Sequence, residues 1–163
     1  RVDIEKAGMI ESVIALLDKY SIHPKWIKAE LTESVCLEND AIIMEKMNLL
    51  KESGLKIAID DFGSGYSSLN LLKRMPIDIL KIDKSFLDYD DNMQEKDEIV
   101  IRDVVELGKH LHMQIIMEGV ETLEQSIFLE SIDCDIAQGY YYGRPMPIEE
   151  FEEILKRNYG VDK

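Results

Sequence analysis

Two adjacent carboxylates, Asp60 and Asp61, follow an apolar segment and precede a glycine-rich turn, Gly63-Ser64-Gly65. Side by side at the end of a buried strand, two carboxylates repel each other and lose hydration, so a divalent cation is the natural compensation. The glycines let the backbone approach a ligand closely. The same run could also be an aspartate N-cap followed by a surface turn. The residues therefore indicate a metal site, with a capped turn as the alternative.

Polar residues recur at the ends of the other apolar segments. Glu30, Lys81 with Asp83, Glu118 and Gln138 all lie at or near the carboxyl ends of predicted strands. Parallel strands bring those ends onto one rim, which is where ligands bind in (β/α)₈ barrels and in doubly wound sheets. Surface ion pairs and solvated strand ends, which have no functional role, are the alternatives at these positions. We therefore expect one rim that carries several carboxylates and a lysine.

Short apolar segments alternate with segments of helical periodicity, which predicts an α/β fold with a parallel sheet covered by helices. The predicted strands are 26–31, 55–60, 78–83, 114–118 and 136–140, and the predicted helices are 4–20, 40–53, 67–74, 98–110, 123–130 and 148–156. A barrel needs eight strand–helix units and typically about 250 residues. The five units counted here predict an incomplete (β/α) barrel, its C-terminal two-thirds. No close internal repeat is visible beyond the alternation.

The composition is that of one globular domain spanning residues 1–163. The net charge of −14 repels nucleic acid and anionic membranes, so a phosphate-bearing substrate would need metal ions as its counter-charge. No apolar run approaches the roughly 18 residues of a membrane span, and the first residues lack the apolar core of a signal peptide. Two distant cysteines, Cys36 and Cys134, indicate thiols rather than a disulfide. These features predict a cytoplasmic location.

Five motifs occur in one order along the chain: Glu30-Leu31-Thr32-Glu33-Ser34, Asp60-Asp61-Phe62-Gly63-Ser64-Gly65-Tyr66, Leu80-Lys81-Ile82-Asp83, Glu118-Gly119-Val120-Glu121-Thr122 and Gln138-Gly139-Tyr140. Together they closely resemble the EAL domain family over residues 4–151. Members of that family are bacterial phosphodiesterases that open cyclic di-GMP to linear pGpG, with two Mg²⁺ or Mn²⁺ ions in a modified TIM barrel. The resemblance thus implies a hydrolase of bacterial second-messenger signalling.

The resemblance also implies a metal-ligand set. Glu30 would bind the first ion, Asp60 would bridge both ions, and Asp61 and Glu118 would complete the second. The chemistry is consistent, because two hard cations on oxygen ligands hold a phosphate oxygen and acidify a shared water.

Further roles follow from the same resemblance. Lys81 corresponds to the family's catalytic lysine, and Gln138 would supply a neutral hydrogen-bonding group. Glu121 would orient the residues that hold the metals. Glu33 would anchor the loop 62–68, which couples metal binding to dimerisation, so a homodimer is expected. Arg144 matches the family's pattern near the substrate guanine.

The family's Glu-Ala-Leu signature and its asparagine metal ligand are absent from the sequence, and the family's spacing places both before Arg1. We therefore expect a competent phosphodiesterase in the parent protein and no activity from these 163 residues alone. One alternative is a degenerate EAL domain that binds cyclic di-GMP or a protein partner without cleavage. A second alternative, on the residues alone, is a divalent-metal barrel enzyme that uses Lys81 as a base on a carboxylate substrate.

Overall fold

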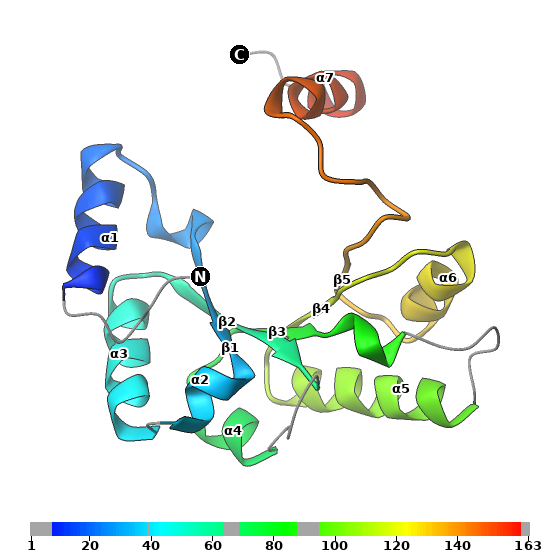
Figure 1. Cartoon of the computed structure of the whole chain (residues 1–163), viewed down its shortest axis with the longest axis horizontal. Helices are drawn as coiled ribbons and strands as arrows, with labels where there is room; N and C mark the ends of the chain where they lie inside the picture. Colours follow the sequence, from blue (N-terminus) through cyan, green and yellow to red (C-terminus); the bar gives the residue numbers. More distant parts are fainter. Residues whose placement is uncertain (1–7, 39, 64–68, 88–94, 161–163) are drawn as a thin grey trace.

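A computed structural model describes residues 8–38, 40–63, 69–87 and 95–160 of the chain. Its centre is one sheet of five parallel strands that are neighbours in chain order (Figure 1). The strands are β1 (Lys28–Thr32), β2 (Lys56–Phe62), β3 (Ile79–Ile82), β4 (Gln114–Met117) and β5 (Ile136–Ala137). A doubly wound sheet reverses its strand order at a switch point. The described strands do not, so the sheet is the singly wound arc of an incomplete (β/α) barrel, as predicted.

Helices alternate with the strands, and α3 and α5 pack against β2 and β4 (Figure 1). The α-helices are α1 (Met9–Lys19), α2 (Glu33–Glu38), α3 (Asp40–Glu52), α4 (Leu69–Arg74), α5 (Glu95–His110), α6 (Leu123–Ser131) and α7 (Ile148–Tyr159), and the 3₁₀ turns are η1 (Pro24–Trp26) and η2 (Lys84–Phe86). Alternate residues of the strands, such as Ile57 and Leu80, join these helices in the main core.

The opposite, inner face of the sheet carries its own small apolar layer. Ala58, Ile79 and Ile116 form this second cluster and are almost fully buried. Because successive strand residues point to opposite faces, residues two positions further along the same strands share the inner face. Asp60, Lys81 and Glu118 stand at those positions, so the fold places them in one polar layer above the apolar one.

Several predicted boundaries were wrong. The first strand begins at Lys28 and not at Trp26, because His23 caps a 3₁₀ turn that contains Trp26. The last strand ends at Ala137 and not at Tyr140, and a helix that was not predicted, α2, begins at Glu33. Ser67, which was predicted to begin a helix, lies outside the described residues.

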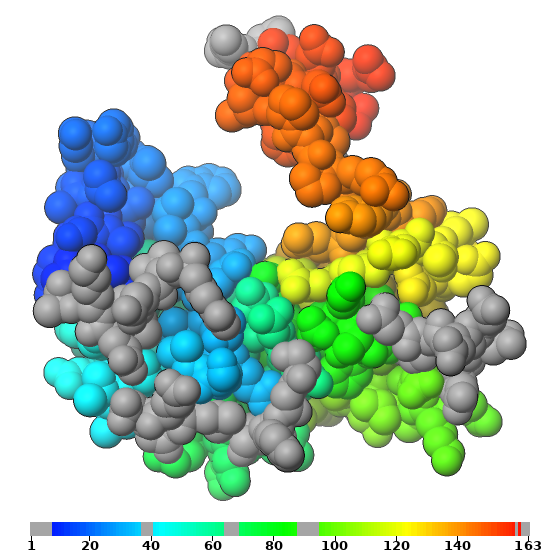
Figure 2. Space-filling view, in the orientation of Figure 1, coloured from blue at the N-terminus to red at the C-terminus, as the bar shows by residue number. Residues whose placement is uncertain are grey.

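The C-terminal helix α7 stands apart from the rest of the molecule, at the end of the segment 138–147 (Figures 1 and 2). Its residues Ile148, Phe151 and Ile154 recur every three positions and remain exposed. Tertiary packing therefore contributes little to this helix within the described residues.

Four helices end in the same way, with a residue of positive φ and paired 6→1 and 5→2 hydrogen bonds, the Schellman motif. The positive-φ residues are Ser21 (52°), Gly54 (84°), His112 (60°) and Asp133 (57°), after α1, α3, α5 and α6. Only one of these four is the glycine that the left-handed conformation favours. The other three ends are therefore strained by their side chains.

This strain predicts opposite effects for two neighbouring histidines. His112→Gly should raise the free energy of unfolding by about 0.5–1 kcal/mol, because glycine adopts positive φ without strain. His110→Gly should lower it by up to about 1 kcal/mol, because His110 is the last residue of α5. Urea denaturation of both variants measures the difference, and equal effects would contradict the assignment.

In the part of the chain that the structure describes, no helix is long and apolar enough to span a membrane.

Cys36 is fully buried, Cys134 is half-buried, and both remain thiols. Burial raises the pKa of the Cys134 thiol, so it stays protonated at neutral pH.

Candidate functional site

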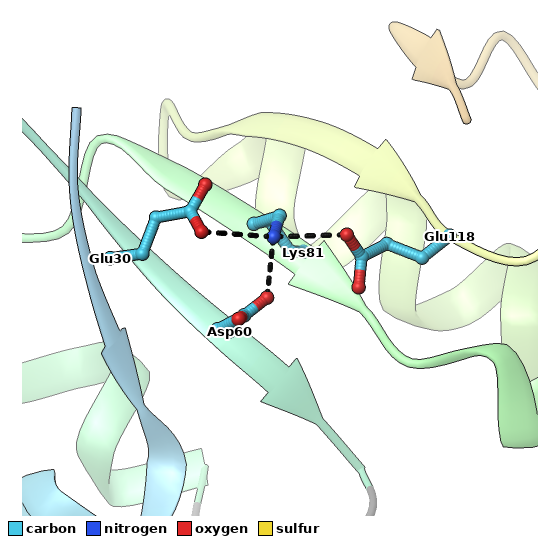
Figure 3. A network of polar contacts seen from close by, with 4 residues as sticks. All are labelled: Glu30, Asp60, Lys81 and Glu118. Atoms are coloured by element: carbon cyan, nitrogen blue, oxygen red, sulfur yellow. Dashed lines mark hydrogen bonds and ion pairs between the residues drawn. The ribbon is translucent and has the colours of Figure 1, made fainter. Parts of the chain in front are cut away.

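The ammonium group of Lys81 lies among three carboxylates on the inner face of the sheet (Figure 3). Its Nζ is 2.6 Å from Asp60 Oδ1, 2.9 Å from Glu118 Oε1 and 3.3 Å from Glu30 Oε2. The residue itself is only 8% exposed. Residues from four successive strand segments thus converge on one buried cation.

The strand register explains this convergence. Lys81 is opposite Ile116, so Glu118, two residues beyond Ile116, follows on the same inner face. Glu30 is opposite Ala58, and Ala58 lies two residues before Asp60. Glu30 therefore lies on the same inner face and reaches Lys81 from β1, on the far side of β2 from β3. Side-chain alternation with a period of two is therefore what gathers the network.

A β-bulge brings Asp61 to the same site as its neighbour Asp60. Ile59 pairs with Leu80 and Phe62 pairs with Ile82, so two residues of β2 stand opposite the single residue Lys81. Asp61 has a φ of 56°, in the left-handed region. Adjacent strand residues normally point to opposite faces, and the bulge removes that restriction. The backbone is thus strained at the point where two carboxylates are needed together.

The residues present fit a divalent metal ion. Asp60, Asp61 and Glu118 each offer one oxygen, and these oxygens all lie within 4.8 Å of one another. Carboxylate oxygens are the ligands that Mg²⁺, Mn²⁺ and Ca²⁺ prefer. Two of these three carboxylates, Asp60 and Glu118, already contact a cation, the ammonium group of Lys81.

The electrostatics of Lys81 follow from these contacts. Burial lowers the pKa of Lys81, while the hydrogen bonds that it donates to Asp60 and Glu118 and the charges of both carboxylates raise it, so that the pKa ends above the ordinary lysine value. In the metal-free chain the side chain is therefore a permanent cation and hydrogen-bond donor at neutral pH.

Glu33 is buried at the beginning of α2, and its Oε2 accepts a hydrogen bond of 3.3 Å from the Gly63 backbone N–H. Gly63 has a φ of 95°, and the Phe86 ring occupies the space that a Cβ would take. Glu33 thus contacts the first part of the predicted loop 62–68. Ser64 and Gly65 lie outside the described residues.

The remaining predicted site residues lie around the rim. The Glu121 backbone N–H donates to Gln125 Oε1 at the beginning of α6, and the Glu121 side chain is exposed. Gln138 follows β5 and is exposed, with its backbone bonded to Met117 and Val120. The Arg144 guanidinium stacks 4.5 Å from the centroid of the Tyr140 ring. Within the part of the chain that the structure describes, no hydrogen bond or ion pair joins the side chains of Glu121, Gln138 or Arg144 to the lysine network.

The structural role of two aspartates at the amino ends of the strands, Asp78 and Asp135, was not predicted from the sequence. Each immediately precedes a strand and accepts the backbone N–H of a residue in the preceding strand, Ile57 or Ile115. The available signal was the spacing, because Asp-x-x-Lys at 78–81 and Asp-x-x-Gln at 135–138 place the aspartate three residues before a predicted site residue.

A singly wound (β/α) sheet with a carboxylate cluster at its carboxyl rim defines the class as a partial (β/α) barrel. Residues 2–145 match the family described as EAL domain, and the chain belongs to this family. The chain is 34% identical over 160 residues to the cyclic di-GMP phosphodiesterase NbdA of Pseudomonas aeruginosa, and 41% identical over 151 residues to the signaling protein YkoW of Bacillus subtilis. The two alignments include 98% and 93% of this chain, but only 20% and 19% of the length of the two relatives.

Solved structures show the same fold. The EAL domain of Mycobacterium smegmatis DcpA matches with a TM-score of 0.86 at 33% identity, over 93% of this chain and 68% of that domain. The PaMucR phosphodiesterase in complex with c-di-GMP matches with a TM-score of 0.82 at 38% identity, over 91% of this chain and 60% of that one. Klebsiella pneumoniae BlrP1, solved with manganese and cyclic di-GMP, matches with a TM-score of 0.80 at 29% identity, over 87% of this chain and 36% of that one.

Proposed function

We propose that this site belongs to a phosphodiesterase that hydrolyses cyclic di-GMP to linear pGpG with two divalent ions. The observation that supports the proposal is the convergence of Glu30, Asp60 and Glu118 on Lys81, with Asp61 beside Asp60 and Glu118, in a chain of the EAL family. Relatives named as cyclic di-GMP phosphodiesterases, and a structure of one with its ligand, support the substrate.

The carboxylates would hold the ions, with Glu30 on the first ion, Asp60 between the two, and Asp61 and Glu118 on the second. Bound Mg²⁺ or Mn²⁺ would neutralise the phosphodiester and acidify a water molecule. The chain's own contribution is the placement of oxygen ligands within 4.8 Å of one another on a rigid sheet.

Lys81 acts as a hydrogen-bond donor in this proposal. Its raised pKa keeps it charged, so it orients the attacking water or a phosphate oxygen and stabilises the negative charge that develops. A general base needs a pKa lowered toward the working pH, and the direction here is the opposite. The contacts of its ammonium with Asp60 and Glu118 therefore favour Lys81 as a donor over the alternative of a barrel enzyme that uses Lys81 as its base.

Around this centre, Glu121 would orient the metal-holding residues, and Gln138 would hydrogen-bond within the site. Arg144, already stacked on Tyr140, would approach the guanine. The contact from Glu33 to Gly63 would connect the metal site to the loop 62–68 and to a homodimer. We place the protein in the bacterial cytoplasm, in contact with the second messenger rather than with a nucleic acid polymer or a membrane.

The 163 residues contain neither a Glu-Ala-Leu sequence nor the family's asparagine ligand. A chimaera therefore tests the proposal best, in which the part of the PaMucR phosphodiesterase that precedes its match to this chain is joined to residues 1–163. With Mn²⁺ and cyclic di-GMP, chromatography should detect pGpG. The Glu118→Gln chimaera should lose at least about a hundredfold in rate, because a metal ligand is removed.

The unextended chain is the matched control and should form no pGpG. If the folded chimaera binds cyclic di-GMP but forms no product, the degenerate binding module is the correct reading. If it neither binds nor cleaves, the proposed substrate is wrong.

A further inference from the structure

The two aspartates that bond the neighbouring strands, Asp78 and Asp135, belong to one repeated arrangement. Asp78 Oδ2 accepts the Ile57 N–H at 2.9 Å, and Asp135 Oδ2 accepts the Ile115 N–H at 2.7 Å. Ile57 and Ile115 are each fully buried, so an unpaired N–H at either position would be costly. Each aspartate thus connects, by a hydrogen bond, the beginning of its own strand to the beginning of the preceding strand.

The spacing from these contacts to the rim is the same on all four strands. Ile57 stands three residues before Asp60, and Ile115 stands three residues before Glu118. Asp78 stands three residues before Lys81, and Asp135 stands three residues before Gln138. A fixed contact at the amino ends therefore sets which side chains become neighbours at the carboxyl ends.

The strands need such a contact because their ladders are short or irregular. β3 has four residues and β5 has two, and the register between β2 and β3 shifts at the bulge next to the site. A slip of one residue would turn Lys81 from the inner face to the outer face. The register that places Lys81 beside Asp60 must therefore be set on the amino-terminal side of the bulge, where Asp78 lies.

Asp78 has the larger set of contacts. Its backbone N–H donates to Ile57 O at 3.0 Å, its carbonyl accepts from Gln114 N at 2.9 Å, and its Oδ1 accepts from Lys51 Nζ at 2.9 Å. One residue thus connects β2, β3 and β4 and the end of α3.

We propose that Asp78 and Asp135 are positioning residues, whose bonds to the Ile57 and Ile115 amides set the register that places Asp60 beside Lys81 and Glu118 beside Gln138. The contact between Lys81 and its carboxylates depends on this register whether or not a metal binds. The metal-binding consequence rests on the proposed function.

The test compares Asp78→Ala with Asp78→Asn and Lys51→Met. Asparagine keeps an acceptor for the Ile57 N–H but loses the charge, and Lys51→Met removes the ion pair while keeping the bond to Ile57. The first readout is the Lys81 ζ-ammonium signal in ¹H–¹⁵N spectra at low temperature, which persists because three carboxylates hold the group. The second readout is the affinity for Mn²⁺ alone.

Asp78→Ala should lose the ammonium signal while its circular dichroism stays that of a folded protein, and its Mn²⁺ affinity should fall about tenfold or more. Asp78→Asn and Lys51→Met should keep the signal and stay within about threefold in affinity. If Asp78→Ala keeps both, or if Lys51→Met loses both, the proposal is overturned.

A second pair of variants covers the case in which Asp78→Ala does not fold. Asp135→Ala should weaken Mn²⁺ binding and speed amide exchange at Ile115 and Glu118, and Asp135→Asn should restore both. Equal behaviour of the two variants would overturn the proposal. An unmodified chain that shows the Lys81 signal but binds no Mn²⁺ would contradict the metal site of Asp60, Asp61 and Glu118. The register proposal would then be decided by the Lys81 signal alone.

Discussion

Replacement of Lys81 by methionine should make the stability of the chain depend on divalent cations. Without the ammonium, the carboxylates of Glu30, Asp60 and Glu118 face one another with no cation between them. Removal of one partner of a fully buried ion pair costs about 3–5 kcal/mol, and the partial exposure of these carboxylates reduces the expected loss to about 1–3 kcal/mol. Added Ca²⁺ should recover most of that loss. Thermal unfolding with and without Ca²⁺ measures both effects.

The matched control is Lys51→Met, which removes a more exposed lysine from a single aspartate, Asp78. It should cost less than about 1 kcal/mol and give no added response to Ca²⁺. In the chimaera, Lys81→Met should also abolish pGpG formation. If Ca²⁺ stabilises the Lys81→Met variant no more than the unmodified chain, the carboxylates do not form a cation site.

The pH dependence of the same contact has a definite sign. Because the folded-state pKa of Lys81 is raised, its stabilising contribution is complete at neutral pH and is lost only as the pH rises beyond the ordinary lysine range. The destabilisation by Lys81→Met, measured by urea denaturation, should therefore be the same at neutral and at mildly alkaline pH.

Replacement of Gly139 by alanine should strongly destabilise the chain. A Cβ at this position would lie 2.1 Å from the Val120 carbonyl oxygen and 2.3 Å from the Val120 nitrogen. Both segments are fixed, because Val120 N bonds Gln138 O at 3.1 Å and Tyr141 N bonds Val120 O at 3.0 Å. We expect a loss of about 3 kcal/mol or more in urea denaturation, since backbone atoms must move.

Gly143→Ala provides the control on the same segment, because its Cβ would meet only Met146 Cε at 3.9 Å. It should change the free energy of unfolding by less than about 0.5 kcal/mol. A Gly139→Ala variant as stable as Gly143→Ala would contradict the close approach of residue 139 to the Val120 backbone.

Period-two alternation made the arrangement of the sheet and its rim predictable from the sequence. A local pattern decides which face Lys81 and Glu118 occupy, and parallel strands then bring their ends together. The order of the strands was also predictable, because each strand is followed by a helix that returns the chain to the same edge.

The details that bring the site residues into contact were not predictable in this way. The bulge at Asp60 and Asp61 depends on the pairing of β2 with β3, and no local pattern gives that pairing. The aspartates at 78 and 135 act across about 20 residues of chain, on amides whose need for a partner is visible only in the fold. The left-handed ends at His112 and Asp133 were hidden as well, because the residue type alone argues against them.

The most direct test of the account is a titration of the chain with Mn²⁺, with free Mn²⁺ followed by electron paramagnetic resonance. The unmodified chain should bind the ion, and Asp60→Asn with Glu118→Gln should bind it at least about tenfold more weakly. Glu149→Gln with Glu150→Gln removes the same formal charge from the exposed helix α7 and should leave the affinity unchanged. Equal affinity of the two double variants would contradict the central claim that Asp60, Asp61 and Glu118 form a metal site.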